Sequence, residues 1–282
     1  MFGRERIEYK SVAQVRTMRR AGLVVADALA AVKGAVRPGV TTDDLDAVAA
    51  DVIRAAGATS NFLGYHGFPR TVCASVNEQV VHGIPGATVL LPGDLLSIDC
   101  GAVVDGWHGD AAFSVVVPGP DGEDVSTEED RDLVAATEES MWRGIAALAV
   151  GSPLGRVGEA VDDYVTQECG GRWGLVEEFT GHGIGTAMHQ APEVLNYRAQ
   201  GRSPRVKEGL CVAVEPMLTA GSPRSRTLAD GWTVVTVDGR RAAHAEHTVA
   251  VLADGLFVLT AVDGGAERLR AAGAAVSSVV ED

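Results

Sequence analysis

Hydrophobic residues near the start of the chain recur every three or four positions, which is the period of an amphipathic helix. Between Ser11 and Val36 they are Val12, Val15, Met18, Leu23, Val25 and Leu29. Ser11 and Gln14 have the spacing of a capping box, and "RPG" follows as a stop signal. The pattern predicts a helix from Ser11 to Val36. A second, shorter helix is expected from Thr41 or Thr42 through "DDLDAVAADVIRAAG" to Gly57.

After the second helix the pattern changes to the β-branched and alternating runs that are typical of strands. "TVCASVN" predicts one strand. "GDLLSIDCGAVV" and "WHGDAAFSVVV" predict a hairpin that is closed by a two-residue turn at Asp105 and Gly106. Further strands are expected at "LCVAVEPMLTA", "WTVVTV" and "HTVAVLADGLFVLT".

Helical patterns return in the second half of the chain. Ser126 and Glu129 predict a capping box that opens a helix to about Val150, and "GSPLGRVGEAVDDYVTQECGG" predicts another helix. "RPGVTTDDLDAVAADVI" aligns loosely with "AVGSPLGRVGEAVDDYV" at an offset of 112 residues, glycine on glycine. The alignment indicates two related halves. The Ala-rich tail from Gly264 predicts a short helix or a frayed end.

Composition narrows the class of protein. The 282 residues carry 38 acidic and 24 basic side chains, a formal charge of −14, and no Lys/Arg run that would neutralise a phosphate backbone. Direct nucleic-acid binding is therefore not expected. The cysteines Cys73, Cys100, Cys169 and Cys211 are scattered, which favours a reducing, cytoplasmic setting, and no apolar stretch is long enough to span a bilayer. We expect a short lead (1–10), one compact domain (11–262) and a tail (263–282).

Asp99 and Asp110 lie inside the two apolar strands of the predicted hairpin. With the turn at Asp105 and Gly106, pairing puts Gly101 opposite Asp110, so alternation places both acids on one face as diagonal neighbours. Two ionised carboxylates on a half-buried face cost several kcal/mol unless a cation or protons compensate them. A solvent-facing pair beside a turn is the simpler interpretation of the hairpin alone.

Other segments carry ligand-type side chains in apolar or glycine-rich settings. They are His182 and His189 in "TGHGIGTAMHQAPEV", Glu215 in "CVAVEPML" and Glu246 in "HAEHTVAV". A single buried glutamate is compatible with an ion pair. Two buried glutamates, two aspartates and a glycine-flanked histidine instead favour an oxygen-rich dinuclear metal site, in which carboxylates bridge two ions.

Five segments in register extend this interpretation to a family. "LGYHGFPRTVCASVNEQVVHGIP", "SIDCGAVVDGWHGDAAFSV", "GHGIGTAMHQAPEVLNY", "VEPML" and "DGWTVVTVDGRRAAHAEHTVAV" together resemble the type I methionine aminopeptidases of the M24 metallopeptidases, from about Val12 to Leu259. The resemblance implies the α+β pita-bread fold, in which two pseudo-symmetric halves form a curved, mostly antiparallel sheet with helices on its outer face. That expectation agrees with the weak internal repeat.

The resemblance also implies roles for individual residues. The ligands of two divalent metal ions, such as Co, Mn or Fe, would be Asp99, Asp110, His182, Glu215 and Glu246, with Asp110 and Glu246 bridging both ions. Glu215 would act as general base and then acid. His82 and His189 would contact the substrate, a peptide with an N-terminal methionine and a small second residue.

The methionine side chain would be bound by an apolar pocket, and the resemblance assigns to it Phe62, Tyr65, Phe68, Cys73, Met188 and Trp232. Aromatic and Met residues also fill ordinary cores, so only their position beside the catalytic motifs favours the pocket. The chain departs from the commoner family pattern here, because Phe62 replaces a small residue or Cys, Phe68 a Tyr and Met188 a Phe. The family leads us to expect a monomer that acts on nascent proteins, with a transient ribosome contact.

Two alternatives remain open at the level of sequence. An Xaa-Pro peptidase of the same fold uses a similar ligand set, although such relatives usually carry an additional N-terminal domain. A non-catalytic pita-bread module that binds peptides is expected to have lost metal ligands, whereas all five positions are occupied in this chain.

Overall fold

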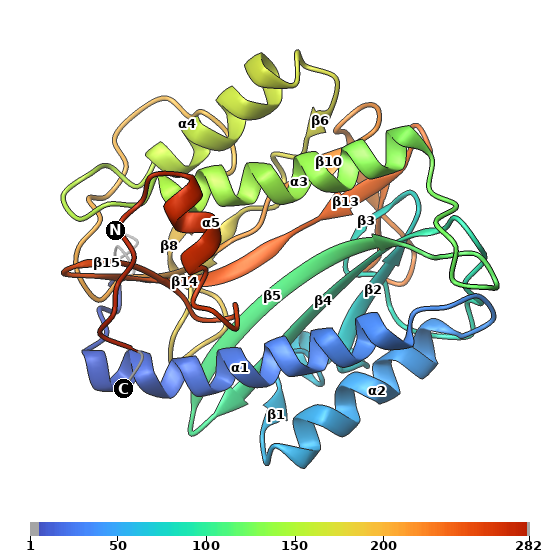
Figure 1. Cartoon of the computed structure of the whole chain (residues 1–282), viewed down its shortest axis with the longest axis horizontal. Helices are drawn as coiled ribbons and strands as arrows, with labels where there is room; N and C mark the ends of the chain where they lie inside the picture. The colour runs from blue at the N-terminus through green and yellow to red at the C-terminus, as the bar shows by residue number, and fades with distance from the viewer. Residues whose placement is uncertain (1–5, 281–282) are drawn as a thin grey trace.

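The computed structural model describes residues 6–280 and contains helices along one face of a curved sheet (Figure 1). Two long helices, α1 and α3, cross this face, and each has a shorter helix, α2 or α4, packed beside it. The helices are α1 (Val12–Ala35), α2 (Thr42–Ala55), α3 (Glu128–Ala146), α4 (Arg156–Asp163) and α5 (Ala266–Ala271). A 3-10 turn covers Tyr65–Gly67, and a π-helical turn (Tyr164–Glu168) continues α4. The expected α+β class is confirmed.

The main sheet has nine strands, in the order β1-β4-β5-β14-β9-β7-β8, with β2 paired to β4 and β15 to β14. All of its pairs are antiparallel. Its strands are β1 (Thr59–Ser60), β2 (Val72–Val76), β4 (Leu95–Val104), β5 (Trp107–Val116), β7 (Gly181–Gly183), β8 (Gln190–Val194), β9 (Cys211–Val214), β14 (Glu246–Leu252) and β15 (Gly255–Val258).

Two small sheets stand beside the main one. The first has the order β13-β10-β6, from β13 (Ala242–His244), β10 (Met217–Thr219) and β6 (Gly174–Leu175). The second has the order β11-β12-β3, from β11 (Ser225–Thr227), β12 (Val234–Thr236) and β3 (Gln79–Val81). Every strand that the hydrophobic pattern predicted is present.

The helix starts follow the cap chemistry of the chain. The Ser11 side chain accepts from the Gln14 backbone while the Gln14 side chain accepts from the Ser11 backbone, as expected. The capping box predicted at Ser126 and Glu129 is wrong. Thr127 and Asp130 form it instead, and α3 ends at Ala146 rather than near Val150. Ser126 does not cap the helix, and its backbone N–H donates a hydrogen bond to the Asp124 carboxylate instead.

The internal repeat is visible in matched turns. Gly39 and Gly151 both have φ of 86°. The Gly39 N–H donates to the Leu90 carbonyl, and the Gly151 N–H donates in the same way to the Val206 carbonyl, both at 2.9 Å. Each turn leads into the shorter helix of its half, α2 or α4. The offset of 112 residues therefore marks two structurally related halves.

The core fills the space between the helices and the sheet. Ile98 and Cys100 of β4 pack against Val25 and Val32 of α1 in one apolar cluster. In the second half Ile145 of α3 packs in a cluster with strand residues of β9 and β14. Each fully buried aliphatic side chain contributes about 1.5–3 kcal/mol. Because side chains alternate along a strand, the residues between these core positions point to the opposite face, which carries the site.

The C-terminal tail forms the short helix α5, one of the two outcomes that its composition predicted. Leu269 is buried in the second-half core, and Val276 makes an isolated parallel bridge to Leu256. The division of the chain at residues 10 and 262 stays a prediction.

Candidate metal centre and substrate pocket

The hairpin of β4 and β5 places the first two acids. Its register is the predicted one, with Val104 opposite Trp107, Gly101 opposite Asp110 and Asp99 opposite Ala112. The turn needs positive φ at both central residues, and Asp105 and Gly106 have φ of 51° and 77°. Asp99 and Asp110 therefore lie on one face as diagonal neighbours, as the pattern of the chain predicted.

The remaining carboxylates continue this row across the sheet. Glu246, the first residue of β14, pairs with Ala112, so the small Ala112 lies between Asp99 and Glu246. Glu215 follows the last residue of β9, where the pairing of Val214 with His247 puts it next to Glu246. Register alone thus brings four acids to one part of the sheet, three of them on strands and Glu215 directly after a fourth strand.

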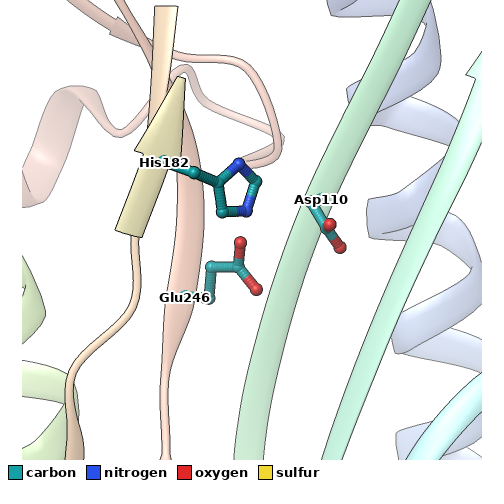
Figure 2. A group of neighbouring side chains, drawn as sticks. All are labelled: Asp110, His182 and Glu246. Atoms are coloured by element: carbon teal, nitrogen blue, oxygen red, sulfur yellow. The ribbon is translucent and has the colours of Figure 1, made fainter. Parts of the chain in front are cut away.

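His182 completes the group from β7. Its Nε2 lies 3.5 Å from Oε1 of Glu215. His182, Asp110 and Glu246 have ligand atoms that all lie within 4.8 Å of one another. Figure 2 shows the His182 ring and the Glu246 carboxylate directed toward each other, with Asp110 on a neighbouring strand. The flanking Gly181 and Gly183 are required, because a Cβ on either would lie within 2.3 Å of a backbone oxygen of β9 or β8.

Asp110 and Glu246 are buried, Asp99 and Glu215 are partly buried, and the hydrogen bonding of the group is incomplete. Within the described residues, one oxygen of Asp99, Asp110 and Glu246 is buried without a hydrogen-bond partner. Burial raises the pKa of Asp99 to about 7, and burial together with the neighbouring carboxylates raises the pKa of Asp110, Glu215 and Glu246 well above the usual range. A divalent cation would stabilise these closely spaced carboxylate oxygens, which have no hydrogen-bond partner. The set of ligand atoms therefore fits a metal site.

The His182 imidazole is uncharged near neutral pH. Burial lowers the pKa of His182 to about 3, which leaves a ring nitrogen free to bind a metal ion. Its Nδ1 lies 3.0 Å from the Gly183 carbonyl, which fixes Nδ1 as the protonated nitrogen and Nε2 as the free one.

Sequence reasoning missed His244, the last residue of β13. Its ligand atom lies within 4.8 Å of those of Glu215 and Glu246, and its Nε2 is buried without a hydrogen-bond partner in the described part of the chain. Burial lowers its pKa to about 3. The signal was present in "HAEH", because His244 lies only two residues before the candidate ligand Glu246.

Two further histidines flank the acidic group. The Tyr65 hydroxyl lies 2.8 Å from Nδ1 of His189, whose ring centroid is 4.3 Å from that of His182. His82 has φ of 59° and contacts the edges of Phe179 and Trp232. Burial lowers the pKa of His82 to about 4.

One cavity of about 230 Å³ is lined by the four acids and by His82, His182 and His189, but not by His244. It is smaller than the roughly 300–1,000 Å³ of sites that hold drug-sized ligands. Carboxylates and imidazoles form one wall, and an apolar cluster forms another. Every predicted pocket residue is in that cluster: Phe62, Tyr65, Phe68, Cys73, Met188 and Trp232. His66 also lines the cavity and was not predicted, because nothing in its local pattern separates it from a loop residue.

None of the helices in residues 6–280 combines the length and the apolar character that a membrane crossing requires.

Known sequences are similar to this chain over most of its length. Residues 16–253 match the sequence model of the metallopeptidase family M24. "Methionine aminopeptidase 1" of Mycobacterium tuberculosis is 48% identical over 262 residues, which cover 92% of this chain and 96% of that protein. "Methionine aminopeptidase 1" of Bacillus subtilis is 41% identical over 253 residues, or 90% of this chain and 98% of that protein.

Solved structures with a similar fold include methionine aminopeptidases, as the similar sequences do. A methionine aminopeptidase from Thermotoga maritima superposes with a TM-score of 0.85 at 34% identity, covering 90% of this chain and 99% of that one. A prolidase from Pyrococcus furiosus, at 18% identity and a TM-score of 0.69, shares the fold alone. The sheet, the repeat and these similarities identify the pita-bread fold, and the chain belongs to the metallopeptidase family M24 as a type I methionine aminopeptidase.

Proposed function

We propose that this enzyme removes the N-terminal methionine from peptides and nascent proteins whose second residue is small. One observation carries the proposal: an acidic group with orphaned oxygens and an apolar cluster face the same small cavity. A substrate held there has its first side chain against apolar atoms and its amino end beside the acids. The chain is expected to act in the cytoplasm as a monomer, with a transient ribosome contact.

The metal ligands are proposed to be Asp99, Asp110, His182, Glu215 and Glu246, which would hold two divalent ions such as Co, Mn or Fe. Glu246 belongs to both groups of neighbouring donors, Asp110 with His182 and Glu215 with His244, which supports a shared position for it. Asp110 is proposed as the second shared ligand, and Asp99 as a ligand of one ion. When bound, such ions supply Lewis acidity and make water a nucleophile near neutral pH.

Glu215 is the proposed general base. It takes a proton from the attacking water and delivers it to the leaving amine. Burial and the neighbouring Asp99 carboxylate raise the pKa of Glu215, which favours its holding the proton between the two steps. Its backbone is held in place, because the side-chain amide of Asn196 donates to the Glu215 carbonyl at 3.2 Å.

His189 and His82 are proposed to hold the peptide. If the Tyr65 hydroxyl donates to Nδ1 of His189, the proton of the ring is on Nε2, which then donates to the scissile amide and stabilises the charge that develops there. His82 is assigned to position the peptide from the side of Trp232.

The apolar cluster is proposed to bind the methionine side chain. Met188 and Cys73 are soft, polarisable groups, and the Phe68 ring meets the Trp232 ring edge to face at 5.1 Å. These contacts leave an apolar space without a charged partner for Lys, Arg, Asp or Glu, so such first residues are disfavoured.

The test is release of methionine from Met-Ala-Ser by purified protein with added Mn(II), Co(II) or Fe(II), beside Met-Leu-Ser and an Xaa-Pro peptide. We expect metal-dependent cleavage of Met-Ala-Ser, little cleavage of Met-Leu-Ser and loss of activity in Glu215→Gln. Cleavage of Xaa-Pro peptides alone would assign the Xaa-Pro peptidase alternative. Peptide binding without any hydrolysis would support the non-catalytic alternative and overturn the proposal.

A further inference from the structure

We infer that His244 is a positioning residue, which holds the Glu215 carboxylate from behind by donating a hydrogen bond from Nε2 to Oε2. The inference rests on the proposed function, because it concerns the side chain assigned there as metal ligand and base. It adds a residue to which the sequence analysis gave no role.

Two imidazoles flank the Glu215 carboxylate, one at each oxygen. Nε2 of His182 lies 3.5 Å from Oε1, and Nε2 of His244 lies 3.9 Å from Oε2. The second distance is about 1 Å longer than an ordinary N–H···O hydrogen bond. Nε2 of His244 is nevertheless buried and has no hydrogen-bond partner within the described residues, so Oε2 is the acceptor beside it. A small side-chain movement completes the bond.

His244 lies behind Glu215 rather than beside the cavity. Glu215, Glu246 and His182 all line the cavity, whereas His244 is not among the described residues that do. Its side chain is only 2% exposed. An imidazole in that position reaches the back of the carboxylate, while the cavity side of Glu215 stays open for an ion and for water.

The backbone at both residues is already fixed. The His244 N–H donates to Oγ of Ser114, and the Ser114 hydroxyl donates to the His244 carbonyl. His244 also pairs with Met217, two residues after Glu215, in the β10 and β13 ladder. The two side chains are therefore presented to each other by elements that leave little freedom, which is the arrangement by which an outer residue orients a ligand.

Loss of such an outer hydrogen bond typically costs about 10–100-fold in metal affinity. The side-chain amide nitrogen of Gln reaches the position of Nε2 in histidine, whereas that of Asn reaches the position of Nδ1. His244→Gln therefore keeps the donor that the inference requires, whereas His244→Asn removes it together with one methylene of side-chain length. The same truncation at His247 controls for the lost packing.

The experiment is calorimetric titration of Mn(II) into chelator-treated wild type, His244→Gln, His244→Asn and His247→Asn, with folding checked by circular dichroism. His247 is the control because it is a half-buried imidazole three residues along, whose Nδ1 lies 2.8 Å from the Thr260 hydroxyl instead of facing the site. We expect wild-type affinity in His247→Asn, affinity within about threefold in His244→Gln, and a loss of about tenfold or more in His244→Asn.

A direct nitrogen ligand gives a different result. Replacing it by an amide in His244→Gln would shift the visible absorption bands of the Co(II)-loaded protein, whereas an outer hydrogen bond leaves their positions unchanged. The inference is overturned by such a shift, by equal losses in His244→Gln and His244→Asn, or by wild-type affinity in His244→Asn. If the wild type binds no metal and releases no methionine, the proposed function fails first and removes the inference with it.

Discussion

The two halves of the chain repeat one turn and one pair of helices, but they deliver their site residues in different ways. In the first half, Asp99 and Asp110 lie on two ten-residue strands joined by a two-residue turn. In the second half, His182, Glu215 and Glu246 come from three segments that are spread over more than sixty residues of sequence.

The difference teaches which contacts hold each set of ligands. The relative position of Asp99 and Asp110 follows from local pairing alone. Glu246 is placed by its pairing with Ala112 of the first half, and His182 by the short β7, which pairs with β9 at Gly183. The second-half ligands therefore depend on long-range contacts, whose loop-closure entropy makes them the easier ones to disturb.

The largest effect on activity is expected at Asp110 and Glu246, the two acids proposed as ligands of both ions. One comes from each half of the chain. Asp110→Asn and Glu246→Gln should each lower the rate of methionine release by about 10³-fold or more, or about 4 kcal/mol, because each removes a charge that compensates the cations. The measurement is the steady-state rate together with metal content by elemental analysis.

The matched control for this prediction is Asp105→Asn in the turn of the same hairpin. Asp105 is exposed and pairs with Arg20, so its loss should leave activity unchanged. A large loss in only one of the two ligand variants would show that the halves do not contribute equally to the metal site.

Structure that depends on local contacts could be predicted from the sequence, whereas structure that depends on long-range contacts could not. The helix Val12–Ala35 and the hairpin register were readable because their signals are local: a capping box, a helical period and an Asp-Gly turn. The cap of α3 was misplaced by one residue, because Ser126 and Thr127 are both capping residues, and Glu129 and Asp130 both follow at the right distance. Local chemistry alone does not separate such neighbours.

The site residues divide in the same way. Glu215 and Glu246 were recognisable as candidates, but their contact depends on the order of strands in the sheet, which the sequence pattern does not give. The resemblance to a family grouped them as ligands without that order. Asn61, which supports the hairpin that carries Asp99 and Asp110 without lining the cavity, was not recognised at all. Its side chain bonds to the Gly109 carbonyl and to His108 on the hairpin, a contact across nearly fifty residues for which its own segment has no periodic signal.

An intermediate effect is expected from Glu8, which precedes the first helix and binds a second-half loop. Its carboxylate accepts from the Thr186 N–H at 3.1 Å, the Thr186 hydroxyl at 2.9 Å and the Gln190 amide at 2.8 Å. His189 lies between these residues. Glu8→Ala should therefore lower kcat/KM for Met-Ala-Ser by about tenfold, or about 1.4 kcal/mol, because the loop that carries His189 loses its anchor.

The location of this effect distinguishes the halves. Hydrogen exchange should increase in residues 184–190 and stay unchanged in the β4 and β5 hairpin. Glu8→Gln is the graded control, since it keeps one carbonyl acceptor for Thr186, and it should lose less activity. Faster exchange across the hairpin would contradict the view that the first-half ligands are held locally.

The smallest effect is expected from Gly106→Ala in the hairpin turn. A residue with a Cβ at φ of 77° is strained by about 1 kcal/mol, so the urea midpoint should fall. Gly34→Ala in α1 is the control of opposite sign, because a Cβ there meets nothing within 4 Å and helix propensity should raise stability by about 0.5–1 kcal/mol.

Activity at saturating metal should remain at the wild-type level in Gly106→Ala. Ten residue pairs between β4 and β5 hold the register, and the site lies four pairs from the turn at Asp110 and six at Asp99. A strained turn therefore costs stability without moving the two acids. Loss of activity along with stability would mean that the turn itself sets the positions of Asp99 and Asp110. The ligands of the first half would then depend on one turn, just as those of the second half depend on long-range contacts.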